Sequence, residues 1–324
     1  MRGDHEDFNL EFGLPNPNRN DGCALCPANT TTLPRTEFRD GHCLWVHQIY
    51  TRDSFFATPF CQHMIFHNVH GGISSLTICP DILHCKHLGT DQYFYASVIW
   101  LMVYTIMDAS PEENMAEIVI DIKRQYAAIG TPERFNNITL SMVCNKTDPP
   151  TKFPCLKGKG AECRHLGAAL EEVWKSYMDR EDVQHAQISI ALRHSVAIED
   201  ILTSNKDTFC FPSATAKAFK HHCFEFLVAF NALAVFYSRD MELKLFDVTI
   251  KAHYLAHIGL IGLYMNPRIG WAYSGEDLMH HCQRLMASCC KGTKLQLGSE
   301  KFAEKYALGM HLKFIAESRG ALLK

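Results

Sequence analysis

The sequence predicts an α+β protein that is predominantly α-helical, with a small β-containing part at its N-terminal side. Two observations lead to this prediction. Residues 43–80 carry short runs of β-branched and aromatic residues bounded by turn formers. From Asp91 onward the apolar residues instead follow helical spacing. We therefore expect a small sheet followed by a large helical remainder.

Three short runs are the expected strands, and residues 1–42 before them are rich in loop formers. A glycine pair, Gly71-Gly72, is typical of a tight turn between the last two runs. The expected strands are Leu44 to Tyr50, Met64 to Val69 and Ile73 to Cys79.

The first helix is expected at 92–107. This uncharged run falls short of the ~20 residues that a membrane span needs, so we expect a buried core helix. The next helix begins with Ser110 as N-cap, Pro111 at the first position and Glu113 completing a capping box. It is expected to end near Ile129.

The rest of the chain is expected to be helical. Ile138 to Cys144 fits either a strand or a buried turn of helix, and the Pro-, Lys- and Gly-rich loop 146–160 is the best internal boundary. Further helices are expected at 161–178, 183–203, 213–239, 243–265, 275–290 and 299–317. The apolar period is clearest in Phe224, Leu227, Val228, Asn231, Ala232 and Val235.

These elements suggest three regions. Residues 1–90 form a small β-containing region with a cysteine knuckle, and residues 91–265 form the helical region. Residues 266–324 are expected to be C-terminal helices that pack back on the N-terminal region.

Composition fits an ordinary globular protein, with 47% hydrophobic and 21% charged residues among 324. A net charge of −3 excludes a protein whose whole surface is basic and binds nucleic acid, but it does not exclude a local basic patch. The charged start of the chain has no apolar signal region, so we expect an intracellular protein of the nucleus or cytoplasm. Its fourteen cysteines are then expected to be reduced thiols or metal ligands.

Cys23-Ala-Leu-Cys26 has the spacing of a zinc knuckle, in which two thiolates hold one Zn²⁺. Cys43 with His47 is the expected second pair. Cys61 with His63, His67 or His70 is an alternative, and two incidental thiols are the plainer interpretation.

His253-Tyr-Leu-Ala-His257 places two imidazoles one helical turn apart. The spacing resembles a zinc-binding helix, but the glutamate of the His-Glu-x-x-His motif is missing. We therefore expect core or interhelical histidines here.

Three dispersed acids suggest metal-dependent phosphate chemistry. Asp81 and His84 lie at a predicted strand-to-helix junction, Glu276 opens a later helix, and Asp4 is near the start. Simple capping explains Asp81 equally well, because Asp before a helix is a common N-cap with which His84 would bond locally.

One segment is densely basic. Its residues Lys152, Lys157, Lys159 and Arg164 are expected to contact nucleic-acid phosphates, or to form an ordinary solvated loop. No Gly-x-Ser-x-Gly, Gly-Lys-Ser/Thr or Gly-x-Gly-x-x-Gly fingerprint is present, and no small-molecule cofactor is expected.

Several short sequence motifs occur together across nearly the whole chain. They include Cys23-Ala-Leu-Cys26-Pro-Ala-Asn29, Thr36-Glu-Phe-Arg39, Asp81-Ile-Leu-His84, Lys251-Ala-His253, Asn266-Pro-Arg268-Ile-Gly-Trp271 and Gly275-Glu276-Asp277. The set resembles a multicopy open-reading-frame family of dinoflagellate genomes. That family is in turn similar to transposases of the CACTA and Plavaka kind, which have an RNase H-like catalytic core.

The resemblance implies a partial RNase H-like β/α element with a large helical insertion. It makes Asp4 and Glu276 candidate ligands for Mg²⁺ or Mn²⁺, with Asp81 and His84 as a supporting motif and DNA as the partner. No sequence precedes Met1 to supply the first strands and first aspartate, so we expect a fragment or relic without activity of its own.

Two functions follow from the sequence. The first is a transposase-derived, RNase H-like relic that binds DNA. The alternative is a non-catalytic, zinc-stabilised interaction or structural protein, and a His- and Cys-rich metalloenzyme is a third reading.

Overall fold

Helices are the only regular secondary structure in the part of the chain that the structure describes. This computed structural model has helix over 66% of its length and no strand among the described residues. Its only strand-like pairing there is an isolated bridge between Asn29 and Pro34. The described residues are 9, 13–16, 19–20, 22–39, 42–63, 75, 77–144, 151–290 and 295–322.

The predicted α+β class, with its RNase H-like element, is therefore wrong. Leu44–Gln48, expected in a strand, forms the 3₁₀ helix η1. A short apolar run does not reveal its own secondary structure, and a strand needs a partner strand to satisfy its backbone. Trp45 decides the local structure instead, because its fully buried ring anchors the segment in the core. Residues 64–74, which include the second expected strand, lie outside the described residues.

The rest of the N-terminal part is made of short helices and turns. Helix α2 spans Arg52–Phe56 and begins at Thr51, whose side chain accepts a hydrogen bond from the backbone N–H of Ser54. The 3₁₀ helix η2 spans Pro59–His63. Helices of this length are not stable by themselves. This region therefore depends on what its side chains contact elsewhere.

A helical stretch, kinked at Leu88 (φ −100°, ψ 23°), crosses the core and confirms the helix expected at 92–107. It consists of the π-helical segment η4 (Leu83–Thr90), helix α3 (Asp91–Leu101) and a second π-helical segment, η5 (Met102–Ile106). The backbone of η4 passes close to α9 (Ile250–Ile261). A Cβ at Gly89 would lie 2.7 Å from the carbonyl oxygen of His84 and 2.9 Å from the side chain of Lys251, so a larger residue would have to displace backbone as well as Lys251.

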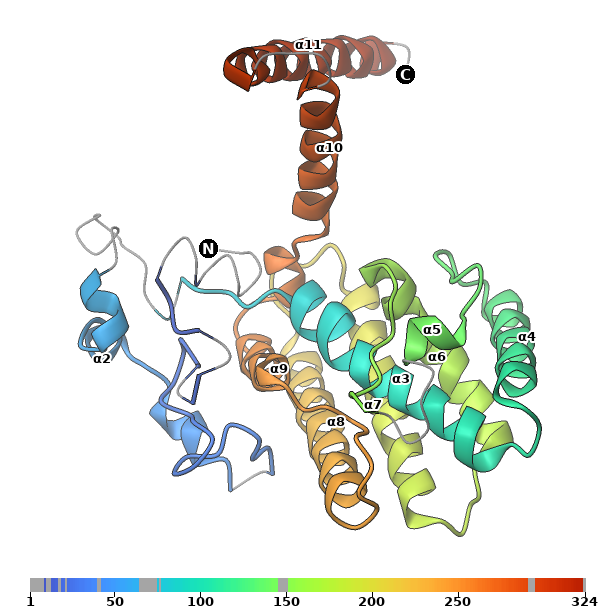
Figure 1. Ribbon diagram of the computed structural model, residues 1–324. Coiled ribbons are helices and arrows are strands. Elements are labelled where there is room, and N and C mark those ends of the chain that lie inside the picture. The colour runs from blue at the N-terminus through green and yellow to red at the C-terminus, as the bar shows by residue number, and fades with distance from the viewer. Residues whose placement is uncertain are drawn as a thin grey trace. The chain divides into compact units, whose positions relative to one another are not determined.

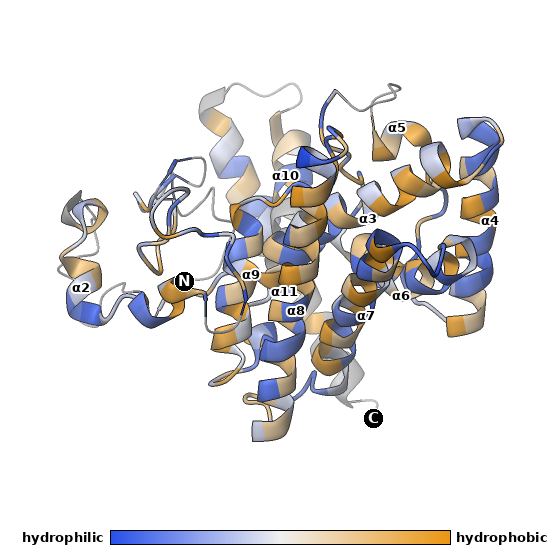
Figure 2. Cartoon of the chain, turned by 90° about the horizontal axis from the view of Figure 1, so that it is seen from below, coloured by the Kyte–Doolittle hydropathy of each residue, from blue (hydrophilic) through white to orange (hydrophobic). Residues whose placement is uncertain are grey.

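Helix α4 (Pro111–Ile129) has the ends that the sequence predicts. Ser110 and Glu113 form the capping box, Pro111 opens the helix and Gly130 ends it at a positive φ of 74°. In Figure 2 hydrophobic and hydrophilic colours alternate along α4, as expected for a helix with one face in the core.

A row of packed helices forms most of the remaining core (Figure 1). Its members are α6 (Gly160–Tyr177), α7 (Val183–Ser204), α8 (Ser213–Arg239) and α9, each packed against the next. A short helix, α5 (Leu140–Val143), and a 3₁₀ turn, η6 (Pro267–Gly270), complete this part. Phe94 of α3 contacts the rings of Phe226, Phe230 and Phe246 at centroid distances of 5.4–5.6 Å.

The predicted extent of α8 is confirmed, but its predicted core face is partly wrong. Val235 is 43% exposed and Ala232 is also exposed. Phe224 and Leu227 of the predicted face are buried, and the other buried residues are Ala216, Phe219, Cys223, Phe226, Ala229, Phe230, Leu233 and Tyr237. From Phe226 to Tyr237 Asn231 is the one strongly polar residue, so periodicity alone could not select the face in this half of the helix.

The chain forms two compact units, Met1–Trp271 and Ala272–Lys324. The second unit contains α10 (Tyr273–Cys290) and α11 (Leu295–Leu322), which contact each other. The expected packing of the C-terminal helices on the N-terminal region stays a prediction.

Among the described residues, no helix has the length and apolar character needed to cross a lipid bilayer.

Candidate metal centre

Two pairs of ligand residues from opposite ends of the first unit meet in its interior. Cys23 and Cys26 come from the N-terminal segment, and His253 and His257 project from one face of α9. All four residues are at most 2% exposed. One ligand atom from each lies within 4.8 Å of all the others.

The separations match those around a tetrahedral zinc ion. Zinc bonds of about 2.3 Å to sulfur and 2.0–2.1 Å to nitrogen place two sulfurs about 3.8 Å apart, sulfur and nitrogen about 3.6 Å apart, and two nitrogens about 3.3 Å apart. The two sulfurs are 3.6 Å apart and the two Nε2 atoms 3.1 Å apart. Cys26 Sγ lies 3.3 Å from His253 Nε2 and 3.4 Å from His257 Nε2, and Cys23 Sγ lies 3.5 Å from the latter.

Local sequence explains how each pair is formed. The turn Cys23-Ala-Leu-Cys26 brings both sulfurs to one side, and the backbone N–H of Leu25 donates to Cys23 Sγ at 3.3 Å. Four-residue spacing on α9 stacks His253 and His257 one turn apart on a single face.

A second layer of contacts orients the ligands. The carbonyl of Arg35 can only accept, so His253 Nδ1 carries the proton at 3.0 Å and Nε2 turns its lone pair to the cluster. The Tyr254 hydroxyl accepts from the N–H of Ala24 at 3.1 Å and donates to the carbonyl of Gly22 at 3.2 Å. These bonds hold the cysteine turn against α9.

Trp45 covers the cluster. Its ring centroid lies 4.4 Å from that of His253 and 4.9 Å from that of His257. Its indole N–H donates to the carbonyl of Glu37 at 2.9 Å. The indole therefore fixes both rings and closes the site to water.

The cluster has the electrostatics of a cation site. Burial raises the pKa of Cys23, but the hydrogen bond from Cys26 and the nearby His253 and His257 outweigh burial and hold it well below the ordinary value. Burial and the adjacent Cys23 raise the pKa of Cys26. Burial lowers the pKa of His257, so its imidazole is neutral and can donate a lone pair. A thiolate and neutral imidazoles are the forms that bind metal.

The structure brings Cys23 and Cys26 together, as predicted for a knuckle, and places a different second pair beside them. Cys43 is buried and His47 is exposed, and neither belongs to the four-residue group. In the alternative set Cys61 is buried, the side chain of His63 is not described, and His67 and His70 lie outside the described residues. His253 and His257 are buried as expected, but they face two thiols.

The remaining candidate acids do not form a described site. Asp4 lies outside the described residues, and Glu276 is in the first turn of α10 with its side chain not described. Asp81 accepts from the backbone N–H groups of Leu83 at 3.1 Å and His84 at 3.2 Å, and contacts His84 Nδ1 at 2.6 Å. These contacts are those of a helix cap.

The basic segment divides in the structure. Lys152, Lys157 and Lys159 are exposed, whereas Arg164 is drawn into the fold. Its Nε donates to Glu199 at 2.8 Å, and its guanidinium lies 4.7 Å from the centre of the Trp271 ring. Arg164 is therefore engaged inside the protein. A phosphate contact by the three lysines stays a prediction.

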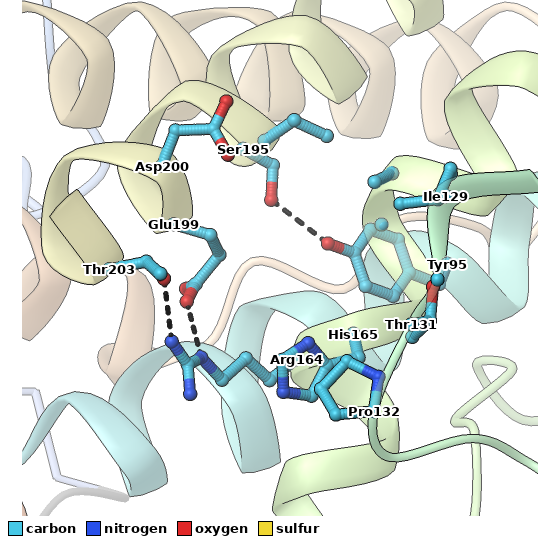
Figure 3. Close-up of a pocket in the computed structure, with 14 residues that line it drawn as sticks. Tyr95, Ile129, Thr131, Pro132, Arg164, His165, Ser195, Glu199, Asp200 and Thr203 are labelled. Atoms are coloured by element: carbon cyan, nitrogen blue, oxygen red, sulfur yellow. Dashed lines mark hydrogen bonds and ion pairs between the residues drawn. The ribbon is translucent and has the colours of Figure 1, made fainter. Parts of the chain in front are cut away.

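Sequence reasoning missed a second buried polar cluster, beside a pocket of about 260 Å³. Lys86 Nζ lies 2.9 Å from Asp91 and 3.2 Å from Glu199, and it donates to Ser195 at 3.0 Å. Figure 3 shows Ser195 hydrogen-bonded to the Tyr95 hydroxyl, and Arg164 reaching Glu199 and Thr203 across the pocket wall. Lys86, Asp91 and Tyr95 lie close together in the sequence, but Arg164, Ser195 and Glu199 come from later helices, so no local motif marks the whole cluster.

This ionic cluster does not have the electrostatics of a nucleophile and base. Burial lowers the pKa of Lys86, but Asp91 and Glu199 outweigh burial and raise it above the ordinary value. Burial raises the pKa of Glu199, but His87, Lys86 and Arg164 hold it well below the ordinary value. Lys86 therefore stays cationic and donates to Ser195, whereas a general base must accept a proton.

Comparison with protein-family models, curated proteins and solved structures found no match for this chain. The resemblance to the dinoflagellate family and to transposases therefore stays a prediction.

Proposed function

We propose that this chain is a non-catalytic structural or interaction protein, in which one zinc ion ties the N-terminal segment to helix α9. One observation carries the proposal: two thiols and two imidazoles, 227 or more residues apart in sequence, point their ligand atoms at one buried position.

Zinc fits this donor set better than other common ions. Mg²⁺ and Ca²⁺ prefer oxygen ligands, whereas two sulfurs and two nitrogens in tetrahedral positions are a usual structural zinc set. The second layer supports this assignment, because His253 donates its other ring N–H to a backbone carbonyl, as zinc-bound histidines commonly do.

A structural role follows from the closed geometry. A catalytic zinc keeps one coordination position for water or substrate, whereas here four side chains fill the tetrahedron and Trp45 covers it. The ion would stabilise the fold by joining the N-terminal segment to helix α9. Short helices such as η1 and α2 do not hold the N-terminal segment together, so the ligand bonds would attach it to the helical core.

Metal content and chelation test this function. The purified protein is expected to contain one zinc per chain by mass spectrometry. A strong chelator should remove it, lower the melting temperature and open the N-terminal segment to protease. Cys26→Ser and His257→Asn should each abolish stoichiometric zinc.

Cys290→Ser provides the matched control, because Cys290 is exposed and lies in the second unit. It should leave zinc content unchanged. A protein with no zinc and no response to chelator would contradict the proposal. So would thiol labelling that shows Cys23 and Cys26 joined to each other, because a disulfide cannot ligate the ion in this way.

A further inference from the structure

Three histidines gather where helices α7 and α8 pack together, in a place separate from the buried cluster. Nδ1 of His194, on α7, lies 2.8 Å from Nδ1 of His222, on α8. The ring of His221 lies 5.7 Å from that of His194 and 5.5 Å from that of His222. Each histidine ring thus has the other two as neighbours.

The contact between His194 and His222 is close to the geometry of two ligands on one ion. Two nitrogens bound tetrahedrally to one ion at 2.0–2.1 Å lie about 3.3 Å apart, so the two Nδ1 atoms need to separate by about 0.5 Å. On binding, the Nδ1 proton between them would move to Nε2 of the ring that carries it, so that both neutral rings direct an Nδ1 lone pair at the same point.

A third and a fourth donor are within reach. The side chain of His221 is 61% exposed, so its ring can rotate without disturbing the core. Glu225, one turn along α8, has a carboxylate oxygen 3.9 Å from His221 Nδ1. The ring of His221 lies farther from the other two rings than the four ligands of the buried cluster lie from one another. His221 would therefore have to move toward His194 and His222 to complete the site.

We infer that His194, His222 and His221 form a second metal site, for an exchangeable first-row divalent ion such as Ni²⁺, Cu²⁺ or Zn²⁺, which clips α7 to α8. Imidazole nitrogens suit these ions, and no thiol is needed. The part-exposed setting favours exchange with solvent.

The charges around the rings are consistent with this site. Burial, with His222, His221 and Arg193 nearby, lowers the pKa of His194 to about 4. Burial and His221 lower the pKa of His222. Neutral rings are the ligand form. Arg193 opposes a cation, and Glu225 is the acidic group that offsets it.

Nickel titration of the untagged full-length chain tests the inference. The buried cluster is first loaded with zinc, and Ni²⁺ binding is then followed by calorimetry. The wild-type protein is expected to bind one Ni²⁺. His194→Gln and His222→Gln should each remove that binding, and His221→Gln should weaken it more than the ~10–100-fold that loss of an outer-shell partner costs.

His311→Gln is the control, because His311 is an exposed histidine of α11 outside both clusters. It should bind nickel like the wild type. Unchanged nickel binding in His222→Gln, or equal loss in His311→Gln, would overturn the inference. Because His221 is exposed, its variant tests the site even if the half-buried positions prove necessary for folding.

The result is separable from the zinc proposal. Cys26→Ser should lose the buried zinc but keep nickel binding at α7 and α8. If the buried cluster held no metal, nickel binding that depends on His194 and His222 would still establish the second site.

Discussion

The Cys23/Cys26/His253/His257 cluster and the Lys86/Asp91/Glu199 network are both buried, but they satisfy their polar atoms in different ways. In the ionic network each charge has an opposite charge beside it: Lys86 lies 2.9 Å from Asp91, and Glu199 lies 2.8 Å from Arg164. In the metal cluster every group is a donor of electron pairs, and all of them face each other.

The difference shows which cluster needs something from outside. Burying an unpaired charge or lone pair is unfavourable, and the ionic network avoids this with its own side chains. In the metal cluster Cys26 donates a hydrogen bond to Cys23, and a cation in the centre would satisfy all four ligand atoms. A polar cluster whose members are all ligands is thus a stronger sign of a cofactor than one with mixed charges.

Metal removal should separate the two clusters most strongly. Structural zinc contributes about 10–16 kcal/mol of apparent binding free energy in small zinc domains, so chelation is expected to unfold the N-terminal part. Hydrogen exchange should show lost protection at residues 22–39 and at α9. The backbone amides of α6 and α7 around Glu199 should keep their protection. If these amides also lost protection at the same chelator concentration, the prediction that the two clusters respond differently to metal removal would be wrong.

Breaking the ionic network should give the next largest effect. Lys86→Met leaves the buried carboxylate of Asp91 without its cation, at a cost of about 3–5 kcal/mol in the free energy of unfolding. Denaturant unfolding measures it, and zinc content should not change. Lys175→Met is the control, because Lys175 is 47% exposed in its ion pair and should change stability by under about 1 kcal/mol.

Loss of one hydrogen-bonding group beside the metal cluster should have a smaller effect. Tyr254→Phe leaves the backbone groups of Ala24 and Gly22 without their partner, which costs about 1–3 kcal/mol. It should also weaken zinc binding about tenfold, measured by competition with a chromophoric chelator. Tyr264→Phe, at a residue that is 80% exposed, should leave zinc affinity unchanged.

The smallest effect should follow from the loss of a helix cap. Asp81→Ala removes the acceptor for Leu83 and His84 and should lower stability by about 1 kcal/mol. Asp81→Asn keeps an acceptor and should lose less. A loss of several kcal/mol in thermal unfolding would show that Asp81 does more than cap the helix.

Individual helices could be predicted because their signals are local. Residues a few positions apart determine the capping box at Ser110 and Glu113, the helix at 92–107 and the extent of α8. The strand expected at Leu44 was wrong, because burial of Trp45 against α9 outweighed local β preference. The Lys86 network has no local motif, so sequence reasoning had no signal for it.

By itself the sequence determined that Cys23 and Cys26 lie together in a turn and that His253 and His257 share a helix face, because both spacings are set by backbone geometry. Only the tertiary structure decided that the two pairs meet. A contact across 227 residues depends on how helices pack around Trp45 and Tyr254, and no short-range pattern in one sequence records that packing.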